Sequence, residues 1–375
     1  MTETVNIIGA GIGGLTTALT LQQKGLNVKI FESSAEIKPV GAGIIMANNA
    51  MQVFQKLGIQ DKIGKAGNKI SYMKITDMQL NNISTVDLTE YEKKYGVHTV
   101  AIHRGELQKI LANEIGHDNI NLSKRLSKIE KAELFKLTFE DNSTIESKLV
   151  IGADGIRSVV RNQLFEESTL RNANQKCWRG ICEMDLPQKY DNELNEAWGK
   201  GKRFGFVKIS KQKVYWYALV NSKNIQQDVV NLTEMFSEFH SDILKIISAT
   251  SKEKIISSDI IDLKPIYKWQ DKNVCLIGDA AHATTPNLGQ GACQAIEDAY
   301  ILGKLLDNGN TLENTFKEYE NVRRKKAHII VNTSWRIGKM SQIENGFGIW
   351  LRNFAMRNSP KSSNKKQMDM IFNLD

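Results

Sequence analysis

The chain has 375 residues, of which 41% are hydrophobic and 25% are charged, so it is long enough for two domains and for a sizeable core. Its formal net charge of +8 is not accompanied by an aromatic-rich nucleic-acid motif, and we expect no nucleic-acid partner. The four cysteines form no C-x-x-C pair and no histidine cluster has ligand spacing, so the sequence indicates neither a metal site nor a disulfide framework.

The first residues have the pattern of a strand, a glycine-rich turn, a helix and a second strand. An apolar run precedes GAGIGG at positions 9–14, and a helical pattern follows it. In such a unit Gly9 allows a tight turn, Gly11 lets the backbone approach a pyrophosphate, and Gly14 lets the helix pack closely on the strand. Glu32, at the end of the second strand, is placed to accept hydrogen bonds from an unphosphorylated ribose. This fingerprint predicts FAD or NAD and does not separate them.

The middle of the chain changes its pattern twice. Short alternating stretches between Ile70 and Ala101 predict antiparallel strands, and Arg104–Ile115 predicts a helix. Leu149–Asp154 reads as a short buried strand that ends in a turn. From Cys177 to about Ile261 alternating aromatic strands follow, with one helical stretch. We therefore predict a sheet-based second domain inserted into the nucleotide-binding domain.

The strand KVYWYALV places Tyr215 and Tyr217 on one face and Trp216 on the other. We favour the two tyrosines for a substrate pocket. A plain aromatic core is the alternative interpretation of the same pattern.

A glycine–aspartate pair late in the chain distinguishes the two dinucleotides. Asp279 follows the apolar strand VCLIG at its carboxyl end, where it can accept hydrogen bonds from polyol hydroxyls, which FAD has in its ribitol. The loop PNLGQG at 286–291 then opens a helix whose N-terminus can stabilise the negative charge of a reduced flavin. The motif therefore predicts FAD.

The remainder, from Asn314 to about Arg357, is predicted to be helical. Its apolar and basic end, Phe347–Asn358, is expected to lie across the two domains and cover hydrophobic surface. A peripheral membrane role is the alternative. The N-terminus shows no basic leader pattern, so we expect a cytoplasmic protein without membrane contact.

Three motifs in this order, GAGIGG, DGIRSVVR at 154–161 and GDAAHATTPNLGQG at 278–291, resemble the class A flavoprotein monooxygenases such as the 4-hydroxybenzoate and salicylate hydroxylases. The resemblance spans almost the whole chain. It implies an α/β fold: a Rossmann-like FAD-binding domain of the GR2 type, an inserted antiparallel-sheet substrate domain and a C-terminal helix. The expected parts are FAD-binding segments 1–70, 101–173 and 265–320, substrate-domain segments 71–100 and 174–264, and a bridging helix and tail at 321–375.

The resemblance also implies contacts to FAD. Arg104 matches the arginine that the family directs at FAD, and Leu126 falls where the family contacts the adenine half through its backbone. The segment 41–58 resembles the one that passes the flavin ring. The expected FAD contacts are Gly9, Gly11, Gly14, Glu32, Gly43, Arg104, Leu126, Asp154, Asp279, Pro286, Gly289, Gln290 and Gly291.

Within the class, GKGKRFGFVKISKQKVYWY and TTPNLGQGACQAIEDA are similar to the FAD-dependent urate hydroxylases and the zeaxanthin-epoxidase-like branch. In the urate enzymes an arginine and an aspartate face the substrate. Arg203 matches the arginine, whereas Asn287 stands in place of the aspartate. An asparagine can donate and accept hydrogen bonds but cannot act as a carboxylate base.

The resemblance implies reduction of FAD by NADH or NADPH, reaction with O₂, and transfer of one oxygen atom through a flavin C4a-hydroperoxide. The expected substrate is a small electron-rich aromatic or heteroaromatic compound, bound through Arg203, Tyr215, Tyr217 and Asn287 by a monomer or homodimer. One alternative is oxygenation of a larger polyketide, terpenoid or tetracycline-like compound. Another, of a different class, is a flavin redox sensor without oxygenase activity.

Overall fold

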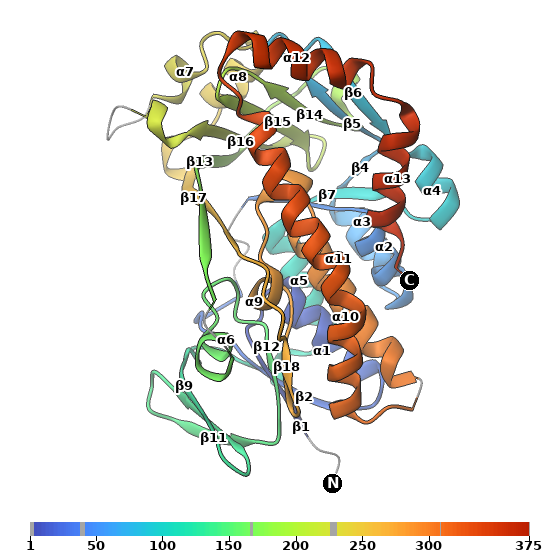
Figure 1. The fold of residues 1–375 in the computed structure, drawn as a ribbon, viewed down its shortest axis with the longest axis vertical. Coiled ribbons are helices and arrows are strands. Elements are labelled where there is room, and N and C mark those ends of the chain that lie inside the picture. Colours follow the sequence, from blue (N-terminus) through green and yellow to red (C-terminus); the bar gives the residue numbers. More distant parts are fainter. Residues whose placement is uncertain (1–3, 38–41, 166–167, 226–230, 308, 375) are drawn as a thin grey trace. The chain divides into compact units, whose positions relative to one another are not determined.

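The computed structural model describes residues 4–37, 42–165, 168–225, 231–307 and 309–374, and it divides into two compact units (Figure 1). The first unit comprises Met1–Pro39, Gly105–Arg171 and Ile261–Ser334. The second comprises Val40–Arg104, Asn172–Ile260 and Trp335–Asp375. The predicted α/β fold with an inserted sheet domain is confirmed.

The first unit is built on a six-stranded sheet in the order β18-β19-β12-β1-β2-β8. All neighbouring pairs are parallel except β18 with β19. The strands are β1 (Thr4–Ile8), β2 (Asn27–Phe31), β8 (Ile120–Asn121), β12 (Leu149–Gly152), β18 (Gln270–Asp271) and β19 (Val274–Leu276). Buried apolar runs form its central strands, as expected of a parallel sheet with both faces covered.

Helices and a small antiparallel sheet complete the first unit. The helices are α1 (Ile12–Gln23), α5 (Arg104–Ile115), α6 (Val159–Leu164), α9 (Asp279–His282), α10 (Gly291–Asp307) and α11 (Leu312–Ser341), which continues into the second unit, with short 3₁₀ turns η1 (His117–Asn119) and η5 (Pro286–Leu288). The small sheet has the order β11-β10-β9 and consists of β9 (Leu126–Lys131), β10 (Phe135–Phe139) and β11 (Thr144–Ser147).

The second unit contains a seven-stranded sheet in the order β17-β13-β16-β15-β14-β5-β6. The sheet is mixed and not purely antiparallel, because β14 pairs with β5 in parallel. The strands are β5 (Tyr72–Thr76), β6 (Asn82–Asp87), β13 (Leu170–Glu183), β14 (Glu193–Trp198), β15 (Lys202–Lys208), β16 (Lys213–Asn221) and β17 (Ile256–Leu263). Short 3₁₀ turns, η2 (Gln188–Tyr190), η3 (Ser222–Asn224) and η4 (Lys252–Lys254), connect them.

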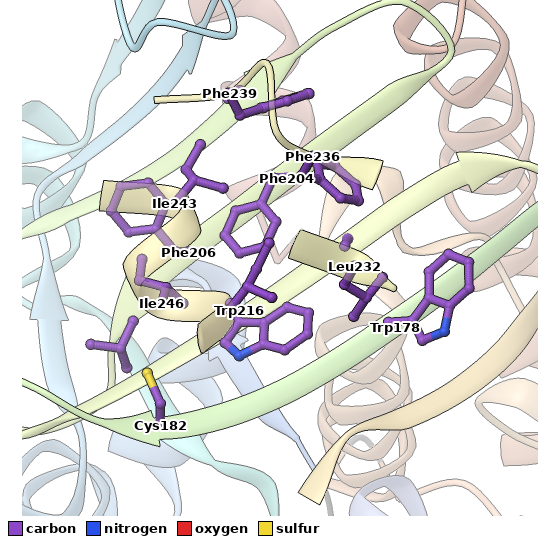
Figure 2. Packing of buried hydrophobic residues seen from close by; sticks show 14 of the residues in the cluster. Trp178, Cys182, Phe204, Phe206, Trp216, Leu232, Phe236, Phe239, Ile243 and Ile246 are labelled. Atoms are coloured by element: carbon purple, nitrogen blue, oxygen red, sulfur yellow. The ribbon is translucent and has the colours of Figure 1, made fainter. Parts of the chain in front are cut away.

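One face of this sheet is an aromatic core. Phe204, Trp216 and Phe236 are fully buried in it, and the rings of Phe204 and Trp216 stack at 5.4 Å (Figure 2). Two short helices contribute the other side of this core, α7 (Leu232–Met235) and α8 (Ser241–Ser248), where the sequence predicted one continuous helix. Trp216 therefore belongs to the core, and the opposite face carries the two tyrosines of the same strand.

The remaining elements of the second unit include a three-stranded sheet in the order β3-β7-β4. They are β3 (Gly43–Met46), β4 (Asn68–Ile70), β7 (Thr99–His103), α2 (Asn48–Lys56), α3 (Gln60–Ala66), α4 (Thr89–Tyr95), α12 (Gly346–Arg357) and α13 (Lys361–Phe372). Because β3 and β4 both pair with β7, residues 42–70 group with the sheet unit, whereas the sequence had placed them in the FAD-binding part. Gly41 lies outside the described residues.

The C-terminal apolar helix differs from the expectation in one respect. Four of its large apolar side chains, Phe347, Trp350, Leu351 and Phe354, are exposed where the sequence predicted burial. Within the described ranges, no helix is both long enough and apolar enough to cross a bilayer.

Candidate functional site

The predicted cofactor motifs lie at the carboxyl ends of four neighbouring strands of the first unit. Gly9 follows β1, Glu32 follows β2, Asp154 follows β12 and Asp279 follows β19. Open α/β sheets bind ligands at this edge. The sheet order therefore brings together residues that are far apart in the sequence.

Two glycines of the first motif are needed for close packing. A Cβ on Gly9 would lie 2.4 Å from the carbonyl oxygen of Ala153, and the φ of Gly9 is +107°. A Cβ on Gly14 would lie 2.1 Å from the carbonyl oxygen of Gly9. Neither position accepts a side chain, so the backbone geometry alone requires glycine at both.

Gly11 is a glycine for a different reason. It is the N-cap of α1, and a Cβ built there has no atom of the described residues within 4 Å. No side chain caps the helix in this part of the structure, so the first N–H groups of α1 have no side-chain acceptor. A helix N-terminus with unbonded N–H groups and room in front of it is suited to a phosphate.

Glu32 supports the glycine turn. Its Oε2 accepts a hydrogen bond from the N–H of Ala10 at 2.7 Å, and its Oε1 accepts from Ser34 N–H at 2.8 Å and Ser33 Oγ at 3.0 Å. Burial raises the pKa of Glu32, but these hydrogen bonds outweigh burial and lower the pKa below its usual value. Glu32 is therefore ionised and fixed beside the glycine turn.

The middle motif holds a buried carboxylate. Asp154 Oδ2 accepts from the N–H groups of Val159 at 2.7 Å and Val160 at 3.2 Å. Its Oδ1 is buried and has no partner within the part of the chain that the structure describes. Burial raises the pKa of Asp154 despite hydrogen bonds from Ser158 and from Val160 and Val159. A buried acceptor atom of this kind has room in its hydrogen-bonding for a donor from outside the chain, either a ligand group or a water.

Arg161 joins the middle motif to the late one. Its Nη1 donates to the carbonyl oxygen of Ala280 at 2.9 Å, and its Nη2 donates to Ile156 O. Ser158 caps α6 by accepting from Arg161 N–H at 2.9 Å. Arg161 therefore fixes the two loops to each other, and it is buried.

The short helix α9 exposes its first side chain and buries its last. Asp279 is exposed at the first position of α9. His282, three residues on, is buried and bonded through Nε2 to Asp298 Oδ2 at 2.7 Å. The same oxygen accepts from Gly278 N–H at 2.9 Å, and Arg323 Nε donates to Asp298 Oδ1 at 2.8 Å. The network holds the loop through the buried His282, and Asp279 is exposed at the strand edge.

The PNLGQG loop has the predicted form. It folds as η5 with Gly289 in the left-handed conformation at φ +62°, and α10 begins at Gly291. The amide nitrogen of Asn287 donates to Ser334 O at 2.8 Å and to Thr285 Oγ1 at 2.9 Å. Asn287 thus anchors the loop as a hydrogen-bond donor. An ionised aspartate at this position would have no hydrogen to donate.

The residues of the first unit fit FAD. Open space before an uncapped helix, a buried carboxylate oxygen without a protein partner and an exposed aspartate at the strand edge are suited to a pyrophosphate and polyol hydroxyls. Leu126 is buried at the start of β9, outside the main sheet. FAD supplies the redox chemistry when it is bound.

The second unit carries a polar cluster on the face opposite its aromatic core. Arg203 Nη1 donates to Glu196 Oε1 at 3.1 Å, the hydroxyl of Tyr217 donates to Glu196 Oε2, and Trp198 Nε1 donates to Glu196 Oε1 at 2.6 Å. Arg203 is almost fully buried at 1% exposure. Burial and the carboxylate of Glu196 raise the pKa of Tyr217 well above its usual value, so the phenol stays protonated.

Further residues of the second unit include the predicted Gly43, Tyr215 and Arg104, and also Arg179. Gly43 packs against the ring of Tyr215, where a Cβ would lie 2.4 Å from Cγ. Tyr215 is 8% exposed, and burial raises its pKa. Arg179 is paired across the sheet with Tyr217. Arg104 is exposed, and its N–H donates to Ala42 O at 3.1 Å.

Glu196 and Trp198 were missed by the sequence interpretation. Glu196 sits in the alternating strand ELNEAW, but only the pairing of β14 with β15 places it near Arg203. No local pattern specifies that register.

Comparison with known proteins gives concordant matches. A family model described as FAD binding domain matches residues 1–334. An aurachin C monooxygenase/isomerase from Stigmatella aurantiaca is 37% identical over 360 residues, covering 94% of both chains. A 2-heptyl-3-hydroxy-4(1H)-quinolone synthase from Pseudomonas aeruginosa (strain UCBPP-PA14) is 31% identical over 382 residues, covering 98% of this chain and 97% of the relative.

A solved structure is also similar over almost the full length. Klebsiella pneumoniae HpxO complexed with FAD and uric acid superposes with a TM-score of 0.89 at 25% sequence identity, covering 98% of this chain and 96% of the other. The predicted cofactor, FAD, is confirmed by the family match together with this FAD complex.

Proposed function

We propose that this chain, which belongs to the FAD binding domain family and is an FAD-dependent monooxygenase, hydroxylates an N-heteroaromatic ring of the quinolone type. Its co-substrates are O₂ and NADH or NADPH, and it acts in the cytoplasm as a monomer or homodimer. The observation that carries the proposal is the hydrogen-bonded cluster around Glu196 in the second unit.

The cluster is suited to a neutral ring. The positive charge of Arg203 is balanced by the negative charge of Glu196 at 3.1 Å, so Arg203 is not free to serve as the sole counter-ion of an anionic substrate. We therefore assign Arg203 to positioning Glu196, where the sequence suggested that it binds the substrate directly. The names of the two relatives likewise describe an aurachin and an alkyl quinolone.

Tyr217 is the residue that we assign to the ring nitrogen. Its proton is engaged by Glu196, which leaves its oxygen to accept a hydrogen bond from a ring N–H of the 4(1H)-quinolone kind. Arg179, across the sheet, is placed on the same face to donate to a ring carbonyl. Tyr215 supplies an aromatic surface beside Tyr217, with their ring centroids 6.0 Å apart.

The test measures NADH and NADPH oxidation by the FAD-loaded protein with 2-heptyl-4-quinolone, unsubstituted 4-quinolone, urate and salicylate, with hydrogen peroxide assayed alongside. We expect acceleration by the quinolones with little peroxide. Acceleration by urate or salicylate alone would contradict the substrate class. An absence of acceleration by every compound would support the larger-substrate or redox-sensor alternatives.

Substitution of Tyr217 provides the matched test of the site. Tyr217→Phe removes one hydrogen bond to the substrate, worth about 1 kcal/mol, so KM for the quinolone should rise about fivefold while FAD stays bound. Tyr72→Phe, at an exposed tyrosine of β5, is the control and should leave KM unchanged. An unchanged KM in Tyr217→Phe would remove that residue from the site.

A further inference from the structure

Helix α12 in the second unit presents its apolar side chains to solvent. Phe347 is 72% exposed, Trp350 59%, Leu351 49% and Phe354 54%. These positions follow the spacing i, i+3, i+4, i+7 and form one continuous stripe along the helix. Four large apolar side chains gathered on one exposed stripe mark an interaction surface.

The stripe is an ordered ridge. The rings of Phe347 and Trp350 stack at 5.9 Å with 26° between their planes, and those of Trp350 and Phe354 stack at 5.6 Å with 16°. Asn345 caps the helix by accepting from the N–H of Gly348. The helix thus holds the three rings in a row.

The opposite side of α12 is anchored. Arg352 is buried, lies 5.0 Å over the ring of Trp198 and donates through Nη1 to Ser341 O at 3.2 Å. Arg352 thus fixes the side of α12 that lies opposite the stripe, and the stripe itself stays exposed.

Basic residues follow the ridge along the chain. The segment 345–368 contains five arginines and lysines and no acidic residue. Arg357 and Lys366 are exposed in the structure. The nearest acidic groups in sequence are paired, Glu344 with Lys223 at 2.7 Å and Asp369 with Lys94 at 3.4 Å, and Lys365 pairs with Glu90 at 3.1 Å between two exposed side chains. The helix therefore combines an exposed aromatic stripe with basic residues in and after it, Arg357 and Lys366 being exposed.

The size of the ridge argues against a second copy of the chain as the occupant. Aromatic side chains bury about 150–250 Å² each, so the exposed stripe amounts to roughly 450 Å². A stable protein interface buries about 800 Å² per partner. Aromatic and leucine side chains beside lysine and arginine, without acidic residues, are instead the composition of helices that lie in a lipid interface.

We propose that α12 is an interfacial helix that seats the second unit on an anionic phospholipid surface. Trp350, Phe347 and Phe354 enter the headgroup region, and Arg357 and Lys366 contact the anionic headgroups. The helix lies in the plane of the interface. The proposal concerns only this face of the second unit and does not depend on which ring compound the enzyme hydroxylates.

The test is flotation of the FAD-loaded full chain with vesicles of phosphatidylcholine alone and of phosphatidylcholine mixed with phosphatidylglycerol. We expect binding to the mixed vesicles that weakens with added salt, and little binding to phosphatidylcholine alone. The double variant Trp350→Ala/Phe354→Ala should lose at least tenfold in vesicle affinity. Tyr267→Ala/Ile256→Ala, at two exposed apolar positions elsewhere, is the matched control and should bind like the wild type.

A second pair of variants tests the charges. Each basic residue near an anionic surface strengthens binding by about fivefold, so Arg357→Gln/Lys366→Gln should bind at least tenfold more weakly. Lys211→Gln/Lys252→Gln removes two other exposed charges and should have a smaller effect. All variants should retain bound FAD, which shows that they fold.

Three results would overturn the proposal. The first is no binding to the mixed vesicles, and the second is binding that the Trp350→Ala/Phe354→Ala variant keeps. The third is a dimer in solution that the same variant converts to a monomer, since the ridge would then be a contact between two copies.

Discussion

Gly11 and Gly14 lie in the same turn, but a methyl group would meet different surroundings at the two positions. At Gly14 it would lie 2.1 Å from Gly9 O, so Gly14→Ala should destabilise the protein by about 1–3 kcal/mol even without cofactor. At Gly11 it would meet no atom of the described residues within 4 Å, so Gly11→Ala should fold normally and bind FAD weakly. Thermal unfolding of the apo proteins and flavin content after purification separate the two effects.

The contrast between these two variants is the informative result. If Gly11→Ala kept full flavin occupancy, the space before α1 would not be the pyrophosphate site. If Gly14→Ala unfolded at the same temperature as the wild type, the turn would be more adaptable than its packing indicates.

Asn287 offers a second test at the residue scale. Its amide nitrogen donates to Ser334 O at 2.8 Å, and an ionised aspartate would place two acceptor oxygens against each other. Asn287→Asp should therefore destabilise the loop by about 1–3 kcal/mol. Urea unfolding at neutral pH measures the change. Gain of urate-stimulated NADH oxidation without loss of stability would show that Asn287 acts on the substrate and not as a loop anchor.

At the scale of a single element, the buried network around Asp298 stabilises the short helix α9 and the turn before it. Burial raises the pKa of Asp298 from its ordinary 3.8, but His282 and Arg323 outweigh burial and lower it in the folded protein. A carboxyl with a lower pKa folded than unfolded stabilises the fold above its unfolded pKa, and this stabilisation is lost as the pH falls below 3.8. Asp298→Asn removes one of the two carboxylates that pair with the buried Arg323, while Glu297 remains, and should cost about 3 kcal/mol at neutral pH.

The pH dependence of the free energy of unfolding identifies the cause of the stability loss in Asp298→Asn. The difference in the free energy of unfolding between wild type and Asp298→Asn should narrow at pH below 3.8, since asparagine does not titrate. Asp307→Asn, which removes an exposed pair with Lys24, should cost less than about 1 kcal/mol. A constant difference across pH would mean that the loss comes from packing and not from the ionised carboxylate.

At the scale of the whole molecule, the motifs and the fold could be predicted because their signals are local. The spacing of Gly9 and Gly14, and Asp279 at a strand end, follow from backbone geometry within one turn. Period-two alternation likewise places Trp216 in the core and Tyr217 on the other face.

The remaining features could not be predicted, because they depend on contacts between segments that are far apart in the sequence. Glu196 meets Arg203 only through the register of β14 and β15, and residues 42–70 join the second unit only because β3 and β4 pair with β7. The apolar period of α12 is the same for a buried and an exposed helix, and packing alone decides that Trp350 faces solvent.

The chain thus has two distinct surfaces. The carboxyl edge of the main sheet in the first unit fits FAD, and the sheet of the second unit carries a polar cluster around Glu196 on one face. Flavin chemistry without the cluster would reduce O₂ to peroxide. Coupling of that chemistry to a substrate is what distinguishes a monooxygenase from a flavin redox sensor.

The most direct measurement of the central claim is isotope incorporation from labelled O₂. The FAD-loaded protein would be incubated with NADH or NADPH, labelled O₂ and the ring compound that most accelerates oxidation, and the product analysed by mass spectrometry. The account predicts one labelled oxygen atom in the product for each NAD(P)H consumed. Unlabelled ring compound, with all of the reducing equivalents recovered as hydrogen peroxide, would contradict it.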